Sequence, residues 1–339
     1  MKNISLFFIA VLFVFSSCEK VFIEPDKASN DPYVNFEYLW NEVDKKYSYF
    51  ELKNIDWLDV KVRYRQKIYA NTKDEDLFNI LADMLKELKD DHTNLFSPFN
   101  VSRYNLPLQK EKNYHSRTVN EFYIPNAMIT GPFVHDFLHN GNVGYVRYAS
   151  FMSAFSKTDL DYVINRYKDT RGIILDVREN GGGNMFNIMP LLERFVDKRT
   201  LVAFSITRNG IGHNDFSDPA PMYANAHNGD KFLKPVVVLI DRGSYSATTF
   251  FSVCTKALPN VVLLGDTTGG GGGLPNGGQL PNGWTYRFSI TQLLDVNKNA
   301  YAEMGVPPDI TASFDWTDLS KDEIIEKAIT EINHLFGKK

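Results

Sequence analysis

The sequence is poor in cysteine, with only Cys18 and Cys254 in 339 residues. Because Cys18 is expected to be lipidated, as argued below, Cys254 has no partner for an intramolecular disulfide. Its neighbours in the stretch 249–253 are largely apolar, which predicts a buried thiol that behaves as a small hydrophobic side chain. No histidine stands near Cys254 in the sequence, and this disfavours a catalytic cysteine.

The sequence also lacks an excess of positive charge. Its formal net charge is −4, with acidic and basic residues interspersed, whereas a nucleic-acid-binding protein normally presents a basic face. We therefore expect no nucleic-acid partner.

Apart from His135 and His139, the histidines lack the His-x-x-x-His spacing of metal ligands, and neither a metal site nor a cofactor is expected. Most of the histidines have no motif around them, and these are expected at the surface or in loops: His115, His135, His139, His213 and His227.

The longest apolar run lies at the N-terminus, where Lys2 precedes the apolar residues 4–15, two serines and Cys18. This layout is typical of a secretory signal, and the run is shorter than the roughly 20 residues that span a bilayer. A cysteine directly after small residues resembles a bacterial lipobox, in which the thiol is acylated. An ordinary signal peptide with a coincidental cysteine is the alternative. We expect an extracytoplasmic protein, in the periplasm or at the cell surface, that is anchored to a bacterial membrane through Cys18.

The N-terminal part of the mature chain has a helical pattern. Apolar residues recur at helical spacing from Phe36 to Leu88 and predict a helical region over 31–96, with Asp74 as the N-cap of its last run. The stretch 97–140 contains four prolines and no strong periodicity, which predicts an irregular connection with a short strand or two.

From residue 141 onward, short apolar strands alternate with helices. We expect strands at 144–151, 172–177, 201–207, 235–241 and 261–265, and helices at 157–167, 187–196, 247–258 and 322–336. This alternation is typical of an α/β fold with a largely parallel sheet covered on both faces. Residues 279–291 are expected to form a hairpin with Pro-Asn-Gly at its turn. The predicted segments are a signal peptide (1–17), a lipidated tether (18–30), the helical region (31–96), the connection (97–140) and the α/β core (141–339).

Two junctions between a strand and a helix are candidates for chemistry. In the segment 242–248, a serine exposes its hydroxyl at the edge of the sheet, beside helix N–H groups that can face an oxyanion. A simple N-cap role for Ser244 or Ser246 explains the same pattern. At the other junction, the glycines at 181–183 let the backbone approach a ligand closely, or they form a tight turn.

A third glycine-rich segment, 269–273, lacks the Gly-Lys-Ser/Thr ending of a phosphate-binding loop. We therefore expect no nucleotide site there and instead predict a mobile loop over a cleft.

Taken together, these segments resemble one family. They are Glu-Leu-Lys-Asp-Asp-His-Thr at 87–93, Leu-Asp-Val-Arg-Glu-Asn-Gly-Gly-Gly at 175–183, Gly-Ser-Tyr-Ser-Ala at 243–247, Gly-Asp-Thr-Thr-Gly at 265–269 and Gly-Val-Pro-Pro-Asp-Ile at 305–310. Their order along the chain is similar to that of the tricorn protease and C-terminal processing peptidase family of serine peptidases. The resemblance covers roughly residues 33–312 and implies a crotonase/ClpP-like α/β core.

The resemblance implies that Ser246 is the nucleophile of a serine peptidase. It further implies an oxyanion hole formed by the N–H of Ala247 and an N–H of Gly181 or Gly182. The processing-peptidase branch uses a lysine as general base, but the corresponding stretch 268–273 contains none.

The tricorn branch instead uses a histidine and a glutamate. His92 matches the histidine that acts as general base, and Glu303 matches the carboxylate that orients it. A serine precedes the histidine in that branch, and here this position is Asp91.

Many members of the family carry a PDZ domain after the helical region. The stretch between His92 and Gly144 is too short for such a module, so an open or loop-gated cleft that acts on short or unfolded peptides is expected. The alternative is a catalytically inactive lipoprotein that binds a peptide or a hydrophobic ligand, as some relatives of this fold do.

Overall fold

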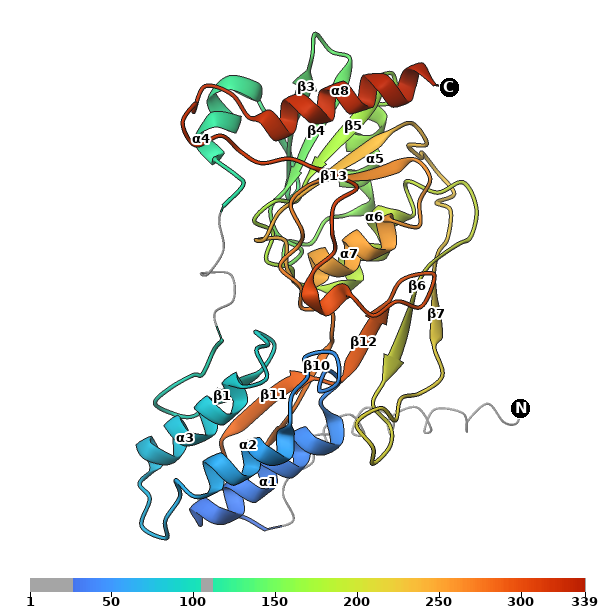
Figure 1. The fold of residues 1–339 in the computed structure, drawn as a ribbon. Coiled ribbons are helices and arrows are strands. Elements are labelled where there is room, and N and C mark those ends of the chain that lie inside the picture. Colours follow the sequence, from blue (N-terminus) through green and yellow to red (C-terminus); the bar gives the residue numbers. More distant parts are fainter. Residues whose placement is uncertain (1–26, 105–111, 339) are drawn as a thin grey trace, which may run out of the picture.

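The computed structural model describes residues 27–104 and 112–338. The predicted signal peptide and Cys18 lie outside these residues. In space, the described residues form a helical unit at one end of the molecule and a sheet covered by helices at the other (Figure 1). No helix of the described chain combines the length and the apolar character needed to cross a bilayer.

The predicted helical region contains α1 (Pro32–Lys46), α2 (Trp57–Arg65) and α3 (Asp74–Lys86). Helix α1 begins where it does because the Asp31 carboxylate accepts the N–H groups of Tyr33 and Val34, a stabilising N-cap. The predicted N-cap of α3 was wrong by one residue. Lys73 occupies its N-cap position without a side-chain hydrogen bond, and Asp74 is the first helical residue, where its negative charge favours the helix dipole.

A hairpin from far along the chain completes this helical unit. Strands β1 (Asn94–Phe96), β11 (Thr285–Ser289) and β10 (Pro275–Gln279) form an antiparallel sheet in that order. The hairpin β10–β11 was predicted, but as part of the α/β core. Trp284 and Phe288 instead share one hydrophobic core with Phe36 and Leu81 of the helices, because that is where the apolar face of the hairpin finds a partner. This hydrophobic core therefore contains residues from both sides of the predicted boundary at residue 141.

The second unit is a seven-stranded sheet, mostly parallel as predicted. Its order is β13 (Ile310–Thr311), β9 (Val261–Gly265), β8 (Val236–Ile240), β5 (Gly172–Asp176), β4 (Val143–Tyr148), β3 (Phe133–Leu138) and β2 (Met128–Thr130). Strands β13, β9, β8, β5 and β4 pair in parallel, whereas β3 pairs antiparallel with both β4 and β2. Strands β2 and β3 lie in the predicted connection, so the sheet begins before residue 141.

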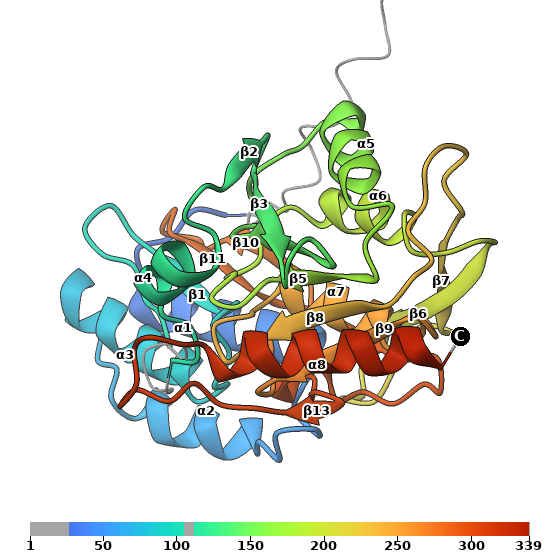
Figure 2. The same ribbon diagram turned by 90° about the horizontal axis from the view of Figure 1, so that it is seen from above.

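Helices cover both faces of this sheet (Figure 2). The bounds are α5 (Lys157–Arg166), α6 (Ile188–Leu192) and α7 (Ala247–Thr255) on one face, and α8 (Glu323–Gly337) on the other. Along β8, Val236 and Val238 face the first group, whereas Val237 and Leu239 face α8, as the alternation of side chains along a strand requires.

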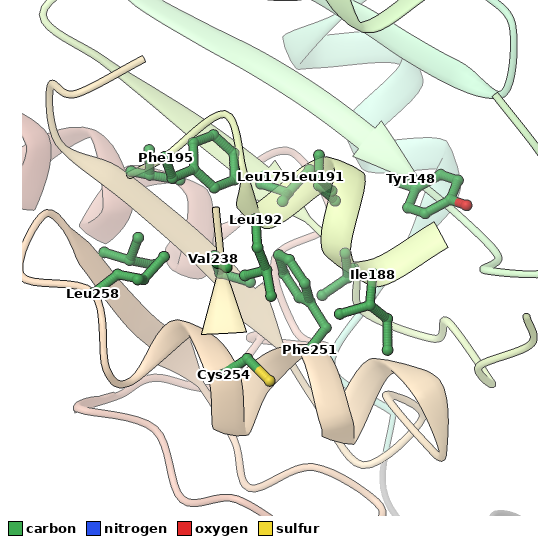
Figure 3. Packing of buried hydrophobic residues seen from close by; sticks show 14 of the residues in the cluster. Tyr148, Leu175, Ile188, Leu191, Leu192, Phe195, Val238, Phe251, Cys254 and Leu258 are labelled. Carbon is green, nitrogen blue, oxygen red and sulfur yellow. The ribbon is translucent and has the colours of Figure 1, made fainter. Parts of the chain in front are cut away.

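Cys254 belongs to α7 and lies in the same hydrophobic core as Leu192 and Leu258 (Figure 3). Burial raises the pKa of its thiol to about 12. The prediction of a buried thiol is confirmed.

A small sheet of β12 (Thr291–Leu294), β6 (Thr200–Thr207) and β7 (Ala220–Ala224) joins the two units. Strand β12 follows β11 after a single residue, Ile290, so one continuous stretch of chain runs from the helical unit toward the large sheet (Figure 1). The short helix α4 (Ser116–Thr118), a π-helical turn (Val119–Tyr123) and the 3-10 turns η3 (Met185–Asn187) and η4 (Ala302–Met304) complete the described elements.

Candidate active site

Ser246 stands at the junction between β8 and α7, in the N-cap position of the helix. Its backbone has φ 56° and ψ −117°, a conformation that a non-glycine residue keeps only when the surroundings hold it. Its side chain makes no capping hydrogen bond. The simple N-cap interpretation of Ser246 therefore does not describe this serine.

The Ser246 hydroxyl instead meets an imidazole from the helical unit. His92 Nε2 lies 2.9 Å from Ser246 Oγ, although the two residues are 154 positions apart. The Asp90 carboxylate accepts the backbone N–H of His92 at 2.8 Å, and the imidazole packs against the Tyr245 ring with centroids 5.2 Å apart. The structure thus brings together the predicted nucleophile and the predicted base.

Burial lowers the pKa of His92, and the nearby Asp90 carboxylate opposes this shift only in part. At neutral pH the ring is therefore uncharged, and one of its nitrogens is a hydrogen-bond acceptor. An acceptor role for Nε2 toward the Ser246 hydroxyl places the ring proton on Nδ1.

The N–H groups of Ala247 and Gly181, the predicted oxyanion donors, have no acceptor in the described chain. The N–H of Gly182 is engaged, because it donates to the Asn180 side chain at 3.0 Å. Of the two predicted glycine donors, Gly181 therefore has the available N–H.

Gly182 supports the site by its small size. A Cβ atom there would lie 2.8 Å from Ser246 Cβ and 2.9 Å from the Ala247 nitrogen, closer than real Cβ atoms approach. Its φ of +94° also favours glycine. The turn that contains the glycines at 181–183, called the glycine-rich turn below, thus lies directly against the strained Ser246.

Asn180 links this turn to the segment 242–246 before α7, called the serine loop below. Local sequence patterns did not indicate this role. Its amide accepts from the Phe151 N–H at 3.2 Å and donates to the Tyr148 carbonyl at 2.9 Å. Its own carbonyl accepts from the Tyr245 N–H at 3.0 Å. Its position inside the motif at 175–183 was the only sequence signal for this role.

Asp241 makes a second link between the two loops. One carboxylate oxygen accepts the N–H of Glu179 at 2.8 Å and those of Gly243 and Ser244 at 3.0 Å each, and burial raises the pKa of this carboxyl to about 6. The hydroxyl of Ser244 is fully buried and donates to the Val177 carbonyl at 2.8 Å. Ser244 is therefore structural.

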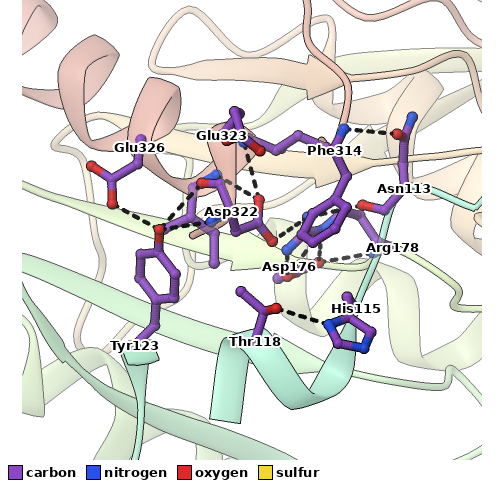
Figure 4. A network of polar contacts seen from close by, with 12 residues as sticks. Asn113, His115, Thr118, Tyr123, Asp176, Arg178, Phe314, Asp322, Glu323 and Glu326 are labelled. Atoms are coloured by element: carbon purple, nitrogen blue, oxygen red, sulfur yellow. Dashed lines mark hydrogen bonds and ion pairs between the residues drawn. The ribbon is translucent and has the colours of Figure 1, made fainter. Parts of the chain in front are cut away.

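The glycine-rich turn is tied to the opposite face of the sheet as well (Figure 4). The guanidinium of Arg178 is fully buried and pairs with Asp176 at 2.6 Å and with Asp322, the N-cap of α8, at 2.8 Å. It also donates to the Asn113 carbonyl at 3.0 Å. These contacts fix the end of β5, from which the glycine-rich turn departs.

Glu303 does not lie where the resemblance implied. Its carboxylate pairs with Lys53 Nζ at 2.6 Å and accepts the Gly272 N–H at 3.0 Å, and it makes no hydrogen bond to the imidazole. His92 Nδ1 is buried without a hydrogen-bond partner of normal geometry, although the Gly273 carbonyl favours the charged ring. Direct orientation of His92 by Glu303 is therefore not present in this structure, because the chain at 272–273 comes between them.

The glycine run 269–273 is buried, so the prediction of a loop over a cleft is wrong. The Gly270 carbonyl accepts the Ser246 N–H at 3.0 Å. A Cβ atom at Gly271 would lie 2.5 Å from the Tyr245 ring, and one at Gly272 would lie 2.6 Å from the Glu303 nitrogen. The run consists of glycines because it passes between these two groups, and it forms a wall of the site.

His135, expected at the surface or in a loop, is fully buried in β3. Its ring nitrogens contact the hydroxyls of Thr130 at 3.0 Å and Tyr167 at 2.8 Å. Within 27–104 and 112–338, no group of three or more His, Cys, Asp or Glu residues could hold a metal ion.

Comparisons with known proteins identify the family of the chain. Residues 142–312 match the model of peptidase family S41, and residues 29–86 match the tricorn protease C1 domain. The carboxy-terminal processing protease CtpA of Bacillus subtilis is 26% identical over 180 residues, which cover 53% of this chain and 37% of that protein. The chain thus matches little more than a third of that relative's length.

Solved structures cover nearly the whole chain. A crystal structure of a protein from Parabacteroides merdae has a TM-score of 0.85 and 39% identity, covering 90% of this chain and 97% of that one. Mature CPAF has a TM-score of 0.68 over 91% of this chain and 98% of its own. Its identity is 13%, so that likeness concerns the fold alone.

Proposed function

Because the chain belongs to peptidase family S41, we propose that it hydrolyses peptide bonds through an acyl-enzyme on Ser246, with His92 as the general base. The observation that carries the proposal is the 2.9 Å contact between His92 Nε2 and Ser246 Oγ. A serine hydroxyl becomes a good nucleophile only when a base within hydrogen-bond reach removes its proton.

In acylation, Ser246 Oγ attacks the carbonyl carbon of the scissile peptide bond while its proton passes to His92 Nε2. The N–H groups of Ala247 and Gly181 donate to the oxygen that becomes negative. The imidazolium then gives its proton to the leaving amine, and the carbon–nitrogen bond breaks. In deacylation, His92 takes a proton from water and the resulting hydroxide attacks the ester carbonyl. The bond to Ser246 Oγ then breaks as the imidazolium returns its proton to that oxygen.

The proposed substrates are short or unfolded peptides. Exposed apolar side chains flank the glycine-rich turn: Met152 is 73% exposed and Phe186 is 87% exposed. Met152 follows Phe151, whose carbonyl accepts the Asn184 N–H, so it lies beside this turn. Such side chains favour contact with an extended chain that presents apolar groups.

The experiment that tests the proposal is labelling of the purified protein with a fluorophosphonate, which modifies activated serines. We expect an adduct on wild-type protein and none on Ser246→Ala, with labelling of His92→Ala reduced by about 10²–10⁴. His334→Ala, an exposed histidine in α8, is the matched control and should label like wild type.

A catalytically inactive protein that binds a peptide or a hydrophobic ligand is the competing function. The neutral, buried His92 in contact with a strained Ser246 favours the enzyme. Wild-type protein that forms no adduct and cleaves nothing in an unbiased peptide library would establish the competing function instead.

We also propose that the protein is anchored to a bacterial membrane, extracytoplasmically, through a lipid on Cys18. The support is the order of Lys2, the apolar run 4–15 and the small residues before the cysteine. Detergent phase partition tests this: the wild-type protein should enter the detergent phase, and Cys18→Ala should remain in the aqueous phase. Equal partition of the two would refute the anchor.

A further inference from the structure

Lys53 is a buried lysine that the proposed mechanism does not use. Its side chain is 6% exposed, and it lies in the helical unit between α1 and α2. Its ammonium contacts four oxygen atoms: Glu303 Oε1 at 2.6 Å, the Lys89 carbonyl at 3.0 Å, and the Leu88 carbonyl and the Tyr47 hydroxyl at 3.1 Å each. The ammonium is thus surrounded by protein acceptors.

These acceptors belong to two segments that meet at His92. The Leu88 and Lys89 carbonyls lie at the start of the turn after α3, where Lys89 has a φ of +48°, and this turn carries His92. Glu303 belongs to η4 and holds the N–H of Gly272, which is followed by the Gly273 carbonyl beside the imidazole. Lys53 therefore connects the turn that carries the base with the glycine run behind it.

We propose that Lys53 is a positioning residue whose ion pair with Glu303 clamps the turn carrying His92 to the glycine run, so that Glu303 orients the imidazole through the backbone. The inference rests on the proposed function, because it assigns His92 as the base. It replaces a direct contact between Glu303 and His92 with a clamp that crosses from the helical unit to the sheet unit.

Each residue of the ion pair depends on the other to remain charged while it is buried. The Glu303 side chain is 3% exposed; burial and the nearby Asp90 raise the pKa of its carboxyl, and the Lys53 ammonium, 2.6 Å away, opposes that shift. Without Lys53, the pKa of the Glu303 carboxyl rises further, so its charged form is disfavoured and the clamp loses its ion pair.

Loss of the negative charge on Glu303 leaves the Lys53 ammonium buried without a compensating charge. The charged groups that act on His92 are Asp90, which raises its pKa, and Arg287 and Lys53, which lower it. An uncompensated Lys53 therefore lowers the pKa of His92 further.

The test compares Lys53→Met, Glu303→Gln and the double variant. Lys61→Met is the matched control, because Lys61 pairs with Glu37 in the same unit at partly exposed positions. Lys53→Met should remain folded by circular dichroism and label with fluorophosphonate about 10² more slowly, the loss expected when a reacting group is misplaced by about 1 Å. On a peptide that the wild type cleaves, kcat should fall while KM stays within about twofold, and Lys61→Met should match wild type.

A titration of His92 by NMR supplies a readout that a purely structural lysine would not move. Glu303→Gln should lower the pKa of His92, and the double variant should return it toward the wild-type value because both charges are removed together. The double variant also provides a folded protein if Lys53→Met does not fold, since a buried ion pair can be replaced by neutral groups.

The clamp is refuted if folded Lys53→Met labels within about twofold of wild type, or if the pKa of His92 is the same in Glu303→Gln and wild type. The NMR titration is made in the Ser246→Ala background, so it tests the clamp even if the wild-type protein proves not to be a peptidase. Failure of wild-type labelling, by contrast, refutes only the proposed function.

Discussion

Gly182→Ala should disable the candidate site while leaving the protein folded. A methyl group at this position would lie 2.6 Å from the Tyr245 carbonyl oxygen, 2.8 Å from Ser246 Cβ and 2.9 Å from the Ala247 nitrogen. Ordinary van der Waals contact begins at about 3.4 Å, so the glycine-rich turn and the serine loop must separate by about half an ångström or more. The φ of +94° at Gly182 adds a strain of about 1–3 kcal/mol for a non-glycine residue.

The separation moves Ser246 and the Ala247 N–H relative to Gly181, so the attacking oxygen and the oxyanion donors no longer share one geometry. Since a misplacement of about 1 Å can cost about 10² in rate, we expect kcat/KM to fall about tenfold to 10²-fold. The melting temperature should fall by several degrees.

The assay is the fluorophosphonate labelling rate, with peptide hydrolysis and thermal melting measured on the same samples. Gly337→Ala is the matched control: its Cβ would have nothing within 4 Å, its φ is not positive, and it lies at the end of α8. It should label nearly as wild type does. If Gly182→Ala is as active as wild type, or if Gly337→Ala is equally impaired, then close packing of the glycine-rich turn on Ser246 does not determine the site.

Four further outcomes follow from the burial of single groups. Because burial lowers the pKa of His92, the acid limb of the profile of kcat/KM against pH should lie below 6.5, the value for an unperturbed histidine; a limb above 6.5 contradicts this. Asn180→Ala leaves the N–H groups of two residues and one carbonyl without their partner, so urea unfolding should show a loss of about 3 kcal/mol. Asp241 has a folded-state pKa of about 6 against an ordinary 3.8, so its stabilising contribution is present below pH 3.8 and is lost as the pH rises through about 6. Relative to Asp241→Asn, the wild type should therefore lose on the order of 3 kcal/mol of unfolding free energy across this window. The Cys254 thiol should resist a thiol reagent in the folded protein and react on unfolding, since its pKa is raised to about 12.

Much of the sheet unit could be predicted from local patterns. The apolar run in β8 and the segment in β9 lie at the predicted places, because a strand buried on both faces requires consecutive apolar residues. The serine at the end of β8 and the glycines after β5 could be noticed for the same reason. Both follow the carboxyl ends of neighbouring parallel strands, where loops of one sheet meet.

The errors concern partners that are distant in sequence. The hairpin β10–β11 was predicted as a hairpin, but its place against the helices depends on where Trp284 and Phe288 find an apolar surface. The glycine run 269–273 has the composition of a flexible loop, yet it is buried because Tyr245 and Glu303 approach it from two sides. Neither outcome is encoded in the neighbours of these residues along the chain.

The site divides in the same way. Ser246, His92 and the oxyanion donors were nominated through the family resemblance that the order of the motifs carries. The local patterns alone left Ser246 as an N-cap candidate and the glycines at 181–183 as a tight turn. Whether a carboxylate reaches an imidazole is decided by packing across units. Here Lys53 attracts Glu303 from 250 positions away in the sequence, and the backbone at 272–273 separates that carboxylate from His92. Such competition between buried charges exists only after the two units have come together, because its strength depends on distances and on the loss of water that folding produces.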